Sequence, residues 1–218
     1  MIDGPTLVAE AVAAGVEIQS VYVEFDARHL IPGGLPDTAT VFEVEPGVLA
    51  KVSSTMSPQP IMAVATIEVR PLPIDSSFVV VCDKIGDPGN AGTILRSAEA
   101  AGADAVVFTP GSVDVWNPKC VRASAGALFW VPVLTDVDPR GLGLPLVGAV
   151  AHGGVNHTAF DFTAPCAVVL GNEAHGIDPA LALDALVTVA HAGRAESLNV
   201  AMAATVLCFE IARQRSLG

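Results

Sequence analysis

The 218-residue sequence predicts an α/β fold, in which a small α/β unit precedes a larger unit built on a parallel sheet. Hydrophobic residues make up 51% of the chain and charged residues 16%, a balance that favours a well-buried core. From residue 78 onward, short apolar runs alternate with segments that end in Gly or Pro, which is typical of parallel strands joined by crossover connections. Between the two units, residues 70–77 hold two prolines and polar residues without periodicity, which predicts a linker.

The small unit is predicted to span residues 1–69. Apolar residues with helical spacing from Leu7 to Ala14 indicate a helix, which Gly15 can end. The elements that follow are also recognised by their apolar pattern: a strand at Ile18–Phe25, the segment Val41–Val44, a short helix at Gly47–Val52 and an apolar run at Ile61–Val69.

The larger unit is predicted to span residues 78–218. Its expected strands are short apolar runs: Phe78–Cys82, Ala105–Phe108, Leu146–Val150, Ala167–Leu170 and Leu186–Val189. The segment from Ser197 to Arg215 predicts a helix, because side chains three and four residues apart form one largely apolar face: Leu198, Met202, Thr205, Phe209 and Ala212.

Composition and spacing exclude several classes of protein. No apolar run reaches about 18 residues, so we expect no membrane span, and the first residues lack the basic segment of a secretory signal. No metal site is expected, because the histidines lack the spacing of metal ligands and the four cysteines are scattered. The scattered cysteines also predict no disulfide framework, which indicates a reducing, cytoplasmic setting. Neither G-x-G-x-x-G nor a P-loop follows the first strand of the larger unit, so we do not expect a nucleotide held in the ordinary dinucleotide manner.

The net charge of −12 argues against a protein that holds nucleic acid mainly by phosphate neutralisation. Five of the eleven Lys and Arg residues nevertheless lie in or beside the polar segments described below: Lys84, Arg96, Lys119, Arg122 and Arg194. Two interpretations are open, a local positive funnel on an acidic body or a chance grouping in an acidic chain.

Residues 83–102 place an asparagine and an arginine on one predicted helix. Asn90 lies near its start, and Ile94 belongs to its buried face. Arg96 follows Ile94 by a rotation of about 200° and therefore projects away from that face. Its planar, charged guanidinium suits phosphate or ribose binding; the alternative is an ion pair on a solvated surface with Asp87 or Glu99.

Two further polar segments follow apolar strands. In Leu-Gly-Asn-Glu-Ala-His-Gly (170–176), Gly171 lets the backbone approach a ligand, and Glu173 either acts on a ligand or caps backbone N–H groups. We interpret His175 as incidental. After an irregular loop at 189–196, Ser197 and Asn199 suit the start of a helix, but Asn199 lies within the apolar periodicity and so predicts a polar partner, either a ligand or the facing loop.

The segment 117–129 adds two basic residues. Lys119 and Arg122 are three residues apart and share a helix face, where they either bind phosphate or form a solvated pair.

In this order, the segments resemble the motifs of the SpoU/TrmH family of RNA 2′-O-ribose methyltransferases. The first is Asp-Pro-Gly-Asn-Ala-Gly-Thr-Ile-Leu-Arg-Ser-Ala in 87–102, the second lies in 170–177, and the third is Glu-Ser-Leu-Asn-Val-Ala-Met-Ala in 196–203. Residues 117–129 are similar to the stretch between the first two motifs. The resemblance covers 78–218, and residues 5–68 resemble the small ribosomal-protein-like RNA-recognition domain that often precedes it.

The resemblance implies a SPOUT-type parallel sheet with a C-terminal trefoil knot, and a homodimer with its active site close to the subunit interface. It also implies that S-adenosylmethionine binds in the loops of the knot. The residues expected around the cofactor are Leu170, Gly171, Asn172, Val189, His191, Leu198 and Ala151.

The implied reaction is methylation of a ribose 2′-hydroxyl in structured RNA, with ribosomal RNA expected because the recognition domain is present. By resemblance, Arg96 helps to deprotonate the hydroxyl and Asn90 positions the substrate or Arg96. Further residues hold the loops and the target nucleotide: Glu173, Ser197 and Asn199. The residues expected to contact RNA are Lys119, Arg122 and Arg194.

The chain departs from the family pattern at two places. It has Val189-Ala190-His191 where Ile-Pro-Met is frequent, and Ala201 where serine is common. Two other functions share the fold: a transfer-RNA ribose methyltransferase, and a non-catalytic RNA-binding or ribosome-assembly factor. Methylation that confers antibiotic resistance would use the same chemistry.

Overall fold

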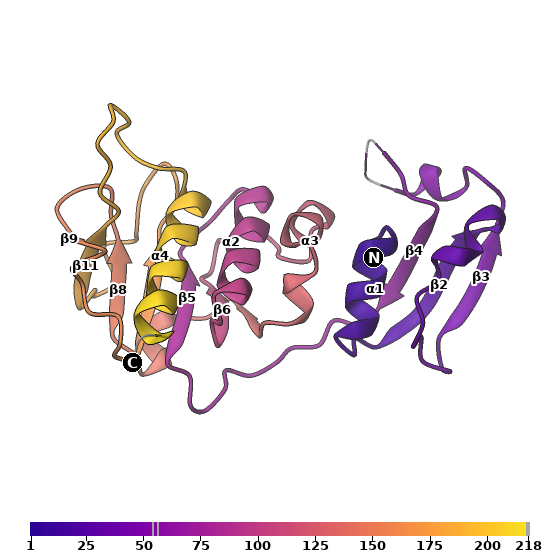
Figure 1. Cartoon of the computed structure of the whole chain (residues 1–218), viewed down its shortest axis with the longest axis horizontal. Helices are drawn as coiled ribbons and strands as arrows, with labels where there is room; N and C mark the ends of the chain where they lie inside the picture. The colour runs from indigo at the N-terminus through magenta and orange to yellow at the C-terminus, as the bar shows by residue number, and fades with distance from the viewer. Residues whose placement is uncertain (54, 56, 217–218) are drawn as a thin grey trace.

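The computed structural model describes residues 1–53, 55 and 57–216 and contains two β-sheets (Figure 1). A four-stranded sheet lies before the predicted linker and a seven-stranded sheet lies after it. The two sheets lie side by side, and the extended segment that joins them runs along one edge of the molecule (Figure 1). Within the described part of the chain, no helix combines the length and apolarity needed to cross a membrane.

The small sheet carries one helix and two short 3-10 helices. Its strand order is β1-β4-β2-β3, with β3 at one edge, parallel to β2. Helix α1 begins with a proline, which suits the first helical position, and it buries Leu7, Val8 and Ala11. The predicted helix and strands are confirmed, whereas β1 and η1 were too short or irregular to predict. The elements are β1 (Ile2–Asp3), α1 (Pro5–Ala13), β2 (Ile18–Glu24), η1 (Phe25–Leu30), β3 (Thr40–Val44), η2 (Leu49–Lys51) and β4 (Ile61–Ala65).

The large sheet is parallel throughout, in the order β7-β6-β5-β10-β8-β11-β9. The central strands β5 and β10 are buried along their whole length, which explains their continuous apolar sequences. The five predicted strands are confirmed to within one or two residues, and β7 and β9 were missed because they have three and two residues. The strands are β5 (Phe78–Cys82), β6 (Ala105–Phe108), β7 (Val133–Thr135), β8 (Leu146–Ala149), β9 (Val155–Asn156), β10 (Cys166–Leu170) and β11 (Ala185–Thr188).

The two faces of the large sheet are covered in different ways. Helices α2 (Pro88–Ala100) and α4 (Val200–Ser216) lie next to each other on one face (Figure 1). On the other face, the sheet packs against side chains from irregular segments and from the short η4 (Pro139–Leu142): Leu72, Val137, Leu142, Leu144, Ile177, Leu181 and Leu183. Both faces of the sheet are therefore covered, one of them without an α-helix.

Helix α2 is fixed at its start and along its side. The Asp87 carboxylate accepts a hydrogen bond from the Asn90 backbone N–H at 2.9 Å and so caps the helix. Helix α3 (Pro118–Ser124) packs against α2 at Gly92, where an added Cβ would lie 2.5 Å from the Ala123 Cβ and the Cys120 carbonyl oxygen. The two helices approach this closely because residue 92 has no side chain.

Helix α4 differs from the sequence prediction in its start and in the face that it buries. It begins at Val200 rather than near Ser197. The predicted apolar face is partly exposed, with Met202 63% and Phe209 50% accessible, whereas Leu198, Thr205 and Ala212 are half-buried. A second set of side chains faces the sheet instead: Ala201, Ala204, Leu207, Cys208 and Ile211. The prediction found one of the two apolar faces of this helix and missed the buried one.

The two sheets belong to one continuous hydrophobic cluster that includes residues from both regions. At their junction, the indole N–H of Trp130 donates to the Glu10 carboxylate at 2.9 Å. Gly126, with φ at +95°, lies against the Glu10 side chain, where a Cβ would be 2.8 Å from Glu10 Cβ and Cγ. These contacts place α1 against the segment that follows α3.

The end of α4 is held to the base of the large sheet by Arg215. Its guanidinium donates to the carbonyl oxygens of Phe162, Ser77 and Ala164 at 3.0 Å each and to the Ser77 hydroxyl at 3.0 Å. It also lies 5.5 Å from the centre of the Phe78 ring. One side chain therefore ties the last helix to the starts of β5 and β10.

We predict that Arg215→Ala lowers the free energy of unfolding by about 2–3 kcal/mol, because hydrogen bonds to a charged group are lost and partly buried carbonyls lose their donor. Urea denaturation measures this change. Arg140→Ala is the matched control: Arg140 pairs with Asp138 on an exposed surface, and its loss should cost below about 1 kcal/mol. Equal losses for the two variants would contradict the assigned role of Arg215.

Candidate active site

A cleft of about 500 Å³ opens where β8, β10 and β11 end. The carboxyl ends of parallel strands are where α/β sheets commonly bind ligands. The start of α4 closes the cleft on one side. Five of the lining residues have polar side chains: Asn172, Glu173, His191, Ser197 and Asn199. The other lining residues are apolar or glycine: Ala149, Val150, Ala151, Leu170, Gly171, Gly176, Ile177, Val189, Leu198, Val200 and Ala203.

All the residues predicted from the sequence to surround a cofactor line this cleft. They come from three segments: Ala151 from the segment after β8, Leu170 to Asn172 from the end of β10, and the remainder from the segment between β11 and α4. Six further lining residues were missed: Ala149, Val150, Gly176, Ile177, Val200 and Ala203. Most of these are small or apolar, so no polar signal in the sequence distinguished them from core residues.

The loop after β10 is a tight turn closed on itself. Asn172 and Gly176 exchange backbone hydrogen bonds at 3.0 and 2.8 Å, and Gly176 takes a φ of +71°. The Asn172 side-chain oxygen accepts from the N–H groups of Ala174 and His175, while its amide donates to the Lys84 carbonyl at 2.8 Å. A Cβ on Gly171 would collide with Gly176 backbone atoms. Asn172 thus fills the capping role that the sequence left open for Glu173.

The free carboxylate of Glu173 instead takes part in a chain of hydrogen bonds across the cleft. The Asn90 amide donates to Glu173 Oε1 at 2.7 Å, and the Asn199 amide donates to Asn90 Oδ1 at 3.1 Å. Three residues from the three sequence motifs are therefore in direct contact. The partner that Asn199 was predicted to need is Asn90, on α2.

Asn199 has a second role at the start of α4. Its side-chain oxygen accepts from the backbone N–H groups of Ala201 at 3.0 Å and Met202 at 3.3 Å. It is therefore the cap of this helix. Ser197 lines the cleft two residues earlier and lies outside the helix. Asn199 thus caps the helix and also has a polar partner, because its oxygen and its amide nitrogen face different groups. That partner is Asn90 on α2 rather than the predicted ligand or facing loop.

Arg96 is not brought into the cleft. It lies on the exposed side of α2, two positions after the buried Ile94, as its spacing predicted. Within the described residues, Arg96 has no hydrogen bond or ion pair, so the predicted alternative of a pair with Asp87 or Glu99 is not found. Its guanidinium is open to a ligand that approaches over α2.

Lys119 rather than Arg96 pairs with Asp87. The Lys119 ammonium lies 2.9 Å from Asp87 Oδ2, and this hydrogen bond holds the pKa of the Asp87 carboxyl below its ordinary value. Lys119 and Arg122 lie on α3 next to α2, and Arg194 lies exposed in the loop before α4. The three residues predicted to bind RNA therefore occupy two separate places, with Lys119 already engaged by a carboxylate.

A second polar network lies beside the loop after β10 and was missed from the sequence. Asp83 is almost fully buried; its carboxylate accepts from the Thr109 hydroxyl at 2.9 Å and from the Asp178 N–H at 2.7 Å. Lys84 pairs with Asp178 at 2.6 Å, which raises the pKa of Lys84 and lowers that of Asp178. The position of Asp83 directly after a buried strand was the available signal.

His191 closes the loop that leads to α4. One ring nitrogen lies 2.7 Å from the Ala195 carbonyl oxygen and the other 3.2 Å from that of Val189. The residue that departs from the family pattern therefore holds the wall of the cleft in place. His175 contacts Asn172 at 3.1 Å and otherwise faces outward.

The cysteines are not candidates for nucleophilic chemistry. All four are buried, and burial raises the pKa of Cys82 well above its ordinary value and that of Cys208 to about 12. Thiols of this kind stay protonated at neutral pH. In the part of the chain that the structure describes, no group of three or more His, Cys, Asp or Glu side chains is arranged to hold a metal ion.

The cleft has the size and lining of a site for a small organic molecule. Glu173 is the charged side chain among the described lining residues, so the site is compatible with a cationic ligand and unsuited to a phosphate group. The polar chain from Glu173 through Asn90 leads from the cleft toward α2, whose outer side carries Arg96.

Two family models match the chain. The model of the SpoU rRNA Methylase family matches residues 77–209, which include the whole large sheet, and that of the MRM3-like substrate binding domain matches residues 1–63. The first match contains every residue of the cleft.

Characterised relatives are similar over most of the chain. The 23S rRNA (guanosine(2553)-2′-O)-methyltransferase RlmP of Bacillus subtilis is 32% identical over 219 residues, which cover 97% of this chain and 87% of the relative. A 23S rRNA (uridine(2479)-2′-O)-methyltransferase of Streptomyces viridochromogenes is 38% identical over 67% of this chain, and the match spans 56% of the relative.

Solved structures agree with the whole fold. The SpoU methyltransferase AviRb from Streptomyces viridochromogenes, solved in complex with AdoMet, superposes with a TM-score of 0.87 at 29% identity, over 100% of this chain and 90% of that chain. An AdoMet-bound rRNA methyltransferase from Sinorhizobium meliloti gives a TM-score of 0.84 at 28% identity, over 97% and 85% of the two chains. With its three motifs joined at one cleft and its parallel sheet shared with these enzymes, the chain belongs to the SpoU rRNA methylase family.

Proposed function

We propose that the protein is an S-adenosylmethionine-dependent methyltransferase that acts on a ribose 2′-hydroxyl of ribosomal RNA. The observation that carries this proposal is the hydrogen-bonded chain Glu173–Asn90–Asn199, which joins the three motifs of the family at one cleft. The named relatives support the reaction and the class of substrate, because they methylate 23S rRNA at ribose 2′-oxygens.

The residues of the cleft fit S-adenosylmethionine. Apolar side chains such as Leu170, Val189 and Leu198 suit an adenosine ring, and the Glu173 carboxylate is compatible with a sulfonium cation. Two similar structures contain this cofactor. When bound, it supplies a methyl group on a positively charged sulfur that leaves as a neutral thioether.

The chain's own residues would bind the RNA, stabilise the attacking oxygen and hold the loops of the site in place. Arg96, exposed and free of protein partners within the described residues, is placed to bind an RNA phosphate and stabilise the oxygen that loses its proton. Asn90 and Glu173 fix the loop after β10 against α2, and Asn199 fixes the start of α4. Alignment of the attacking oxygen with the methyl group then lowers the barrier.

The C-terminal segment is proposed to form a trefoil knot. Supporting it, β10 follows β8 in the sequence yet lies between β5 and β8 in the sheet. The loop after β10 and the segment before α4 also line the same cleft. A bent cofactor would then be held between loops whose geometry the threaded chain makes rigid.

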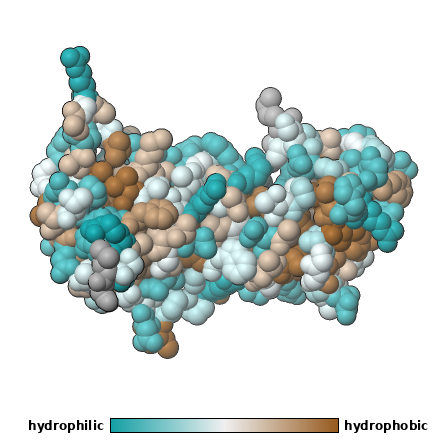
Figure 2. All heavy atoms as spheres, viewed as in Figure 1, coloured by the Kyte–Doolittle hydropathy of each residue, from teal (hydrophilic) through white to brown (hydrophobic). Residues whose placement is uncertain are grey.

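The exposed face of α4 supports a homodimer. Met202, Val206 and Phe209 are 63%, 38% and 50% accessible and lie at spacings of four and three residues on one side of the helix. Figure 2 shows apolar atoms gathered on the surface over α4. Since Asn199 caps the start of α4, a second copy on this face would place the active site beside the subunit interface.

A transfer-RNA substrate is less well supported, because the model of a substrate binding domain matches residues 1–63 and the relatives named above act on 23S rRNA. A non-catalytic RNA-binding role is also less well supported, since the motif residues are all present and Asn90 joins Glu173 to Asn199.

The cofactor assignment predicts saturable binding of S-adenosylmethionine, with about one molecule per chain because the residues expected around the cofactor all line the same cleft. Isothermal titration calorimetry of the purified protein measures it, and S-adenosylhomocysteine should bind the same site. A folded protein that releases no heat with either compound would remove the basis of the proposal.

Arg96→Ala should reduce methyl transfer to unmodified ribosomal RNA by roughly 100-fold or more, because a group that stabilises the developing oxyanion is lost. Its affinity for S-adenosylmethionine should stay unchanged, since Arg96 lies outside the cleft. Incorporation of tritiated methyl groups measures the rate. Glu99→Ala, one turn further on the exposed side of α2, is the control; a folded Arg96→Ala variant with normal turnover would exclude the assigned role.

Phe209→Glu should convert a dimer into a monomer at micromolar concentration, because it places a charge in the apolar face of α4. Sedimentation velocity distinguishes the two states. Ile74→Glu, in the exposed linker, is the control and should remain dimeric. A monomeric wild-type protein, or a Phe209→Glu variant that still dimerises, would refute this interface.

A further inference from the structure

A pair of stacked aromatic rings stands at the edge of the small sheet. Tyr22 on β2 and Phe42 on β3 are paired in register, with ring centres 5.1 Å apart and planes inclined by 17°. Tyr22 also lies opposite the buried Met62 on β4. The three side chains form a row across the sheet that begins at a buried residue and ends at the edge strand.

The outer end of this row is uncovered. Strand β3 is the last strand of the sheet, and none of its residues is buried. Phe42 is 45% accessible, and among the described residues no aromatic ring other than that of Tyr22 contacts it. Because Tyr22 occupies the inner side of the Phe42 ring, the outer ring face is the part left open beyond the sheet edge.

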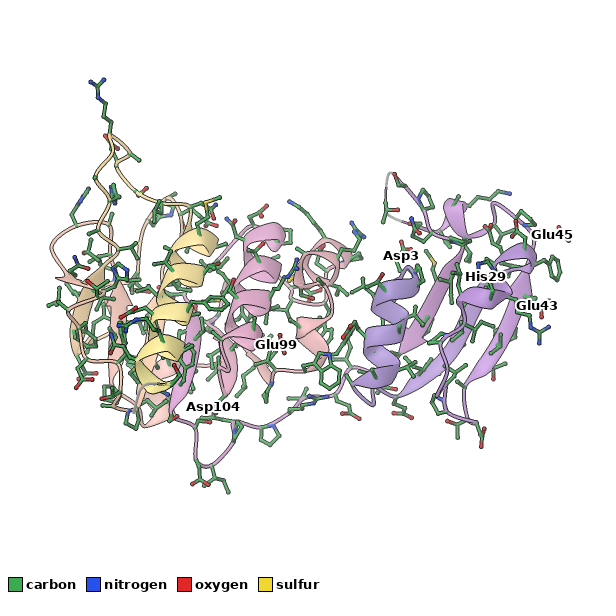
Figure 3. The ribbon with its side chains drawn as sticks, viewed as in Figure 1. Asp3, His29, Glu43, Glu45, Glu99 and Asp104 are labelled. Atoms are coloured by element: carbon green, nitrogen blue, oxygen red, sulfur yellow. The ribbon has the colours of Figure 1, made fainter. Side chains whose placement is uncertain are left out.

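The surroundings of the row are acidic. Residues 1–69 hold nine Asp and Glu and two basic residues, Arg28 and Lys51. Figure 3 shows Glu43 and Glu45 at the outer edge of the small sheet, near the end of β3. Arg28 is engaged by Glu43 at 2.7 Å. A ligand that relied on phosphate contacts would be repelled here, because neutralisation of phosphates requires an excess of Lys and Arg.

We propose that Phe42, supported by Tyr22, is a stacking platform for an unpaired nucleobase of the RNA substrate. This inference rests on the proposed function and assigns a recognition surface to the region that matches a substrate binding domain. A base placed on the open face of Phe42 continues the row of rings, and stacking needs no positive charge.

Three properties of the interaction follow from this geometry. The nucleotide must be unpaired, since a base within a duplex has neighbours on both faces. Recognition by the platform tolerates different bases, because each has an aromatic face. The contribution of Phe42 to affinity depends little on salt, since it involves no counterion release.

The test is RNA binding by the full-length protein, measured by fluorescence anisotropy. The probe is a labelled single-stranded RNA of mixed sequence about twelve nucleotides long, compared with the same strand annealed to its complement. Phe42→Ala should weaken binding to the single strand about tenfold, as expected for one stacked base, and leave binding to the duplex unchanged. The loss should be the same at low and high salt.

Three further variants separate stacking from folding. Phe42→Trp keeps an aromatic face and should retain binding, whereas Phe42→Leu keeps apolar bulk without such a face and should behave like Phe42→Ala. Val41→Ala is the matched control, because Val41 is 40% accessible on the same strand but points to the other side of the sheet. An unchanged far-UV circular dichroism spectrum and an unchanged thermal unfolding midpoint show that each variant is folded.

The outcomes separate this inference from the proposed function. Methyl transfer by the wild-type protein tests the function, and Phe42→Ala should then raise the KM for unmodified ribosomal RNA with little change in kcat. Normal single-strand binding by Phe42→Ala, or equal losses for Phe42→Trp and Phe42→Leu, would overturn the platform even if methyl transfer is confirmed. Wild-type protein that binds no single-stranded RNA would overturn it as well and would indicate a surface for a protein partner. Loss of single-strand binding in a protein without transferase activity would support the platform and refute the function.

Discussion

The side-chain amide of Asn90 donates to Glu173 and accepts from Asn199, and these two hydrogen bonds connect the start of α2 with the loop after β10 and the start of α4. Each of the three segments is also fixed by a side chain of its own: Asp87 caps the helix that carries Asn90, Asn172 closes the loop that carries Glu173, and Asn199 caps α4. The helix caps and the turn therefore fix the segments around the cleft, and the side-chain amide of Asn90 connects these segments. Such a network is held rigidly only if every member is satisfied, which gives the site a defined shape before any ligand binds.

Much of the fold could be predicted because its physical signals are local. Buried parallel strands such as Ala105–Phe108 are continuous apolar runs, and their bounds were found correctly. Strands β7 and β9 were missed since two or three residues carry no pattern, and their pairing is fixed by neighbouring strands rather than by their own sequence. The buried face of α4 was missed for a different reason. This helix is apolar on two sides, and sequence periodicity cannot tell which side meets the sheet and which side stays exposed.

The candidate site shows the same division. Motif spacing brought the expected cofactor residues to one cleft, but it did not foresee that Asn199 would serve as both cap and partner of Asn90, because that depends on contacts between residues 109 positions apart. Pairing of Lys119 with Asp87, which leaves Arg96 open on α2, likewise depends on how closely α2 and α3 approach at Gly92. The acidity of residues 1–69 is visible in the sequence, whereas the stacked rings beside it require the register of β2 and β3. The electrostatics of the chain thus favour local contacts over long-range attraction of RNA.

Nucleoside mass spectrometry of unmodified large-subunit ribosomal RNA, incubated with the protein and S-adenosylmethionine and digested to nucleosides, tests the central claim most directly. The digest reports where the methyl group resides, which binding or incorporation alone does not. If the three motifs joined at Asn90 catalyse ribose methylation, the digest will contain one additional 2′-O-methylnucleoside. This nucleoside should be absent when the Asn90→Ala protein is used. A base-methylated nucleoside, or no methylated product from folded protein that binds the cofactor, would contradict the assignment.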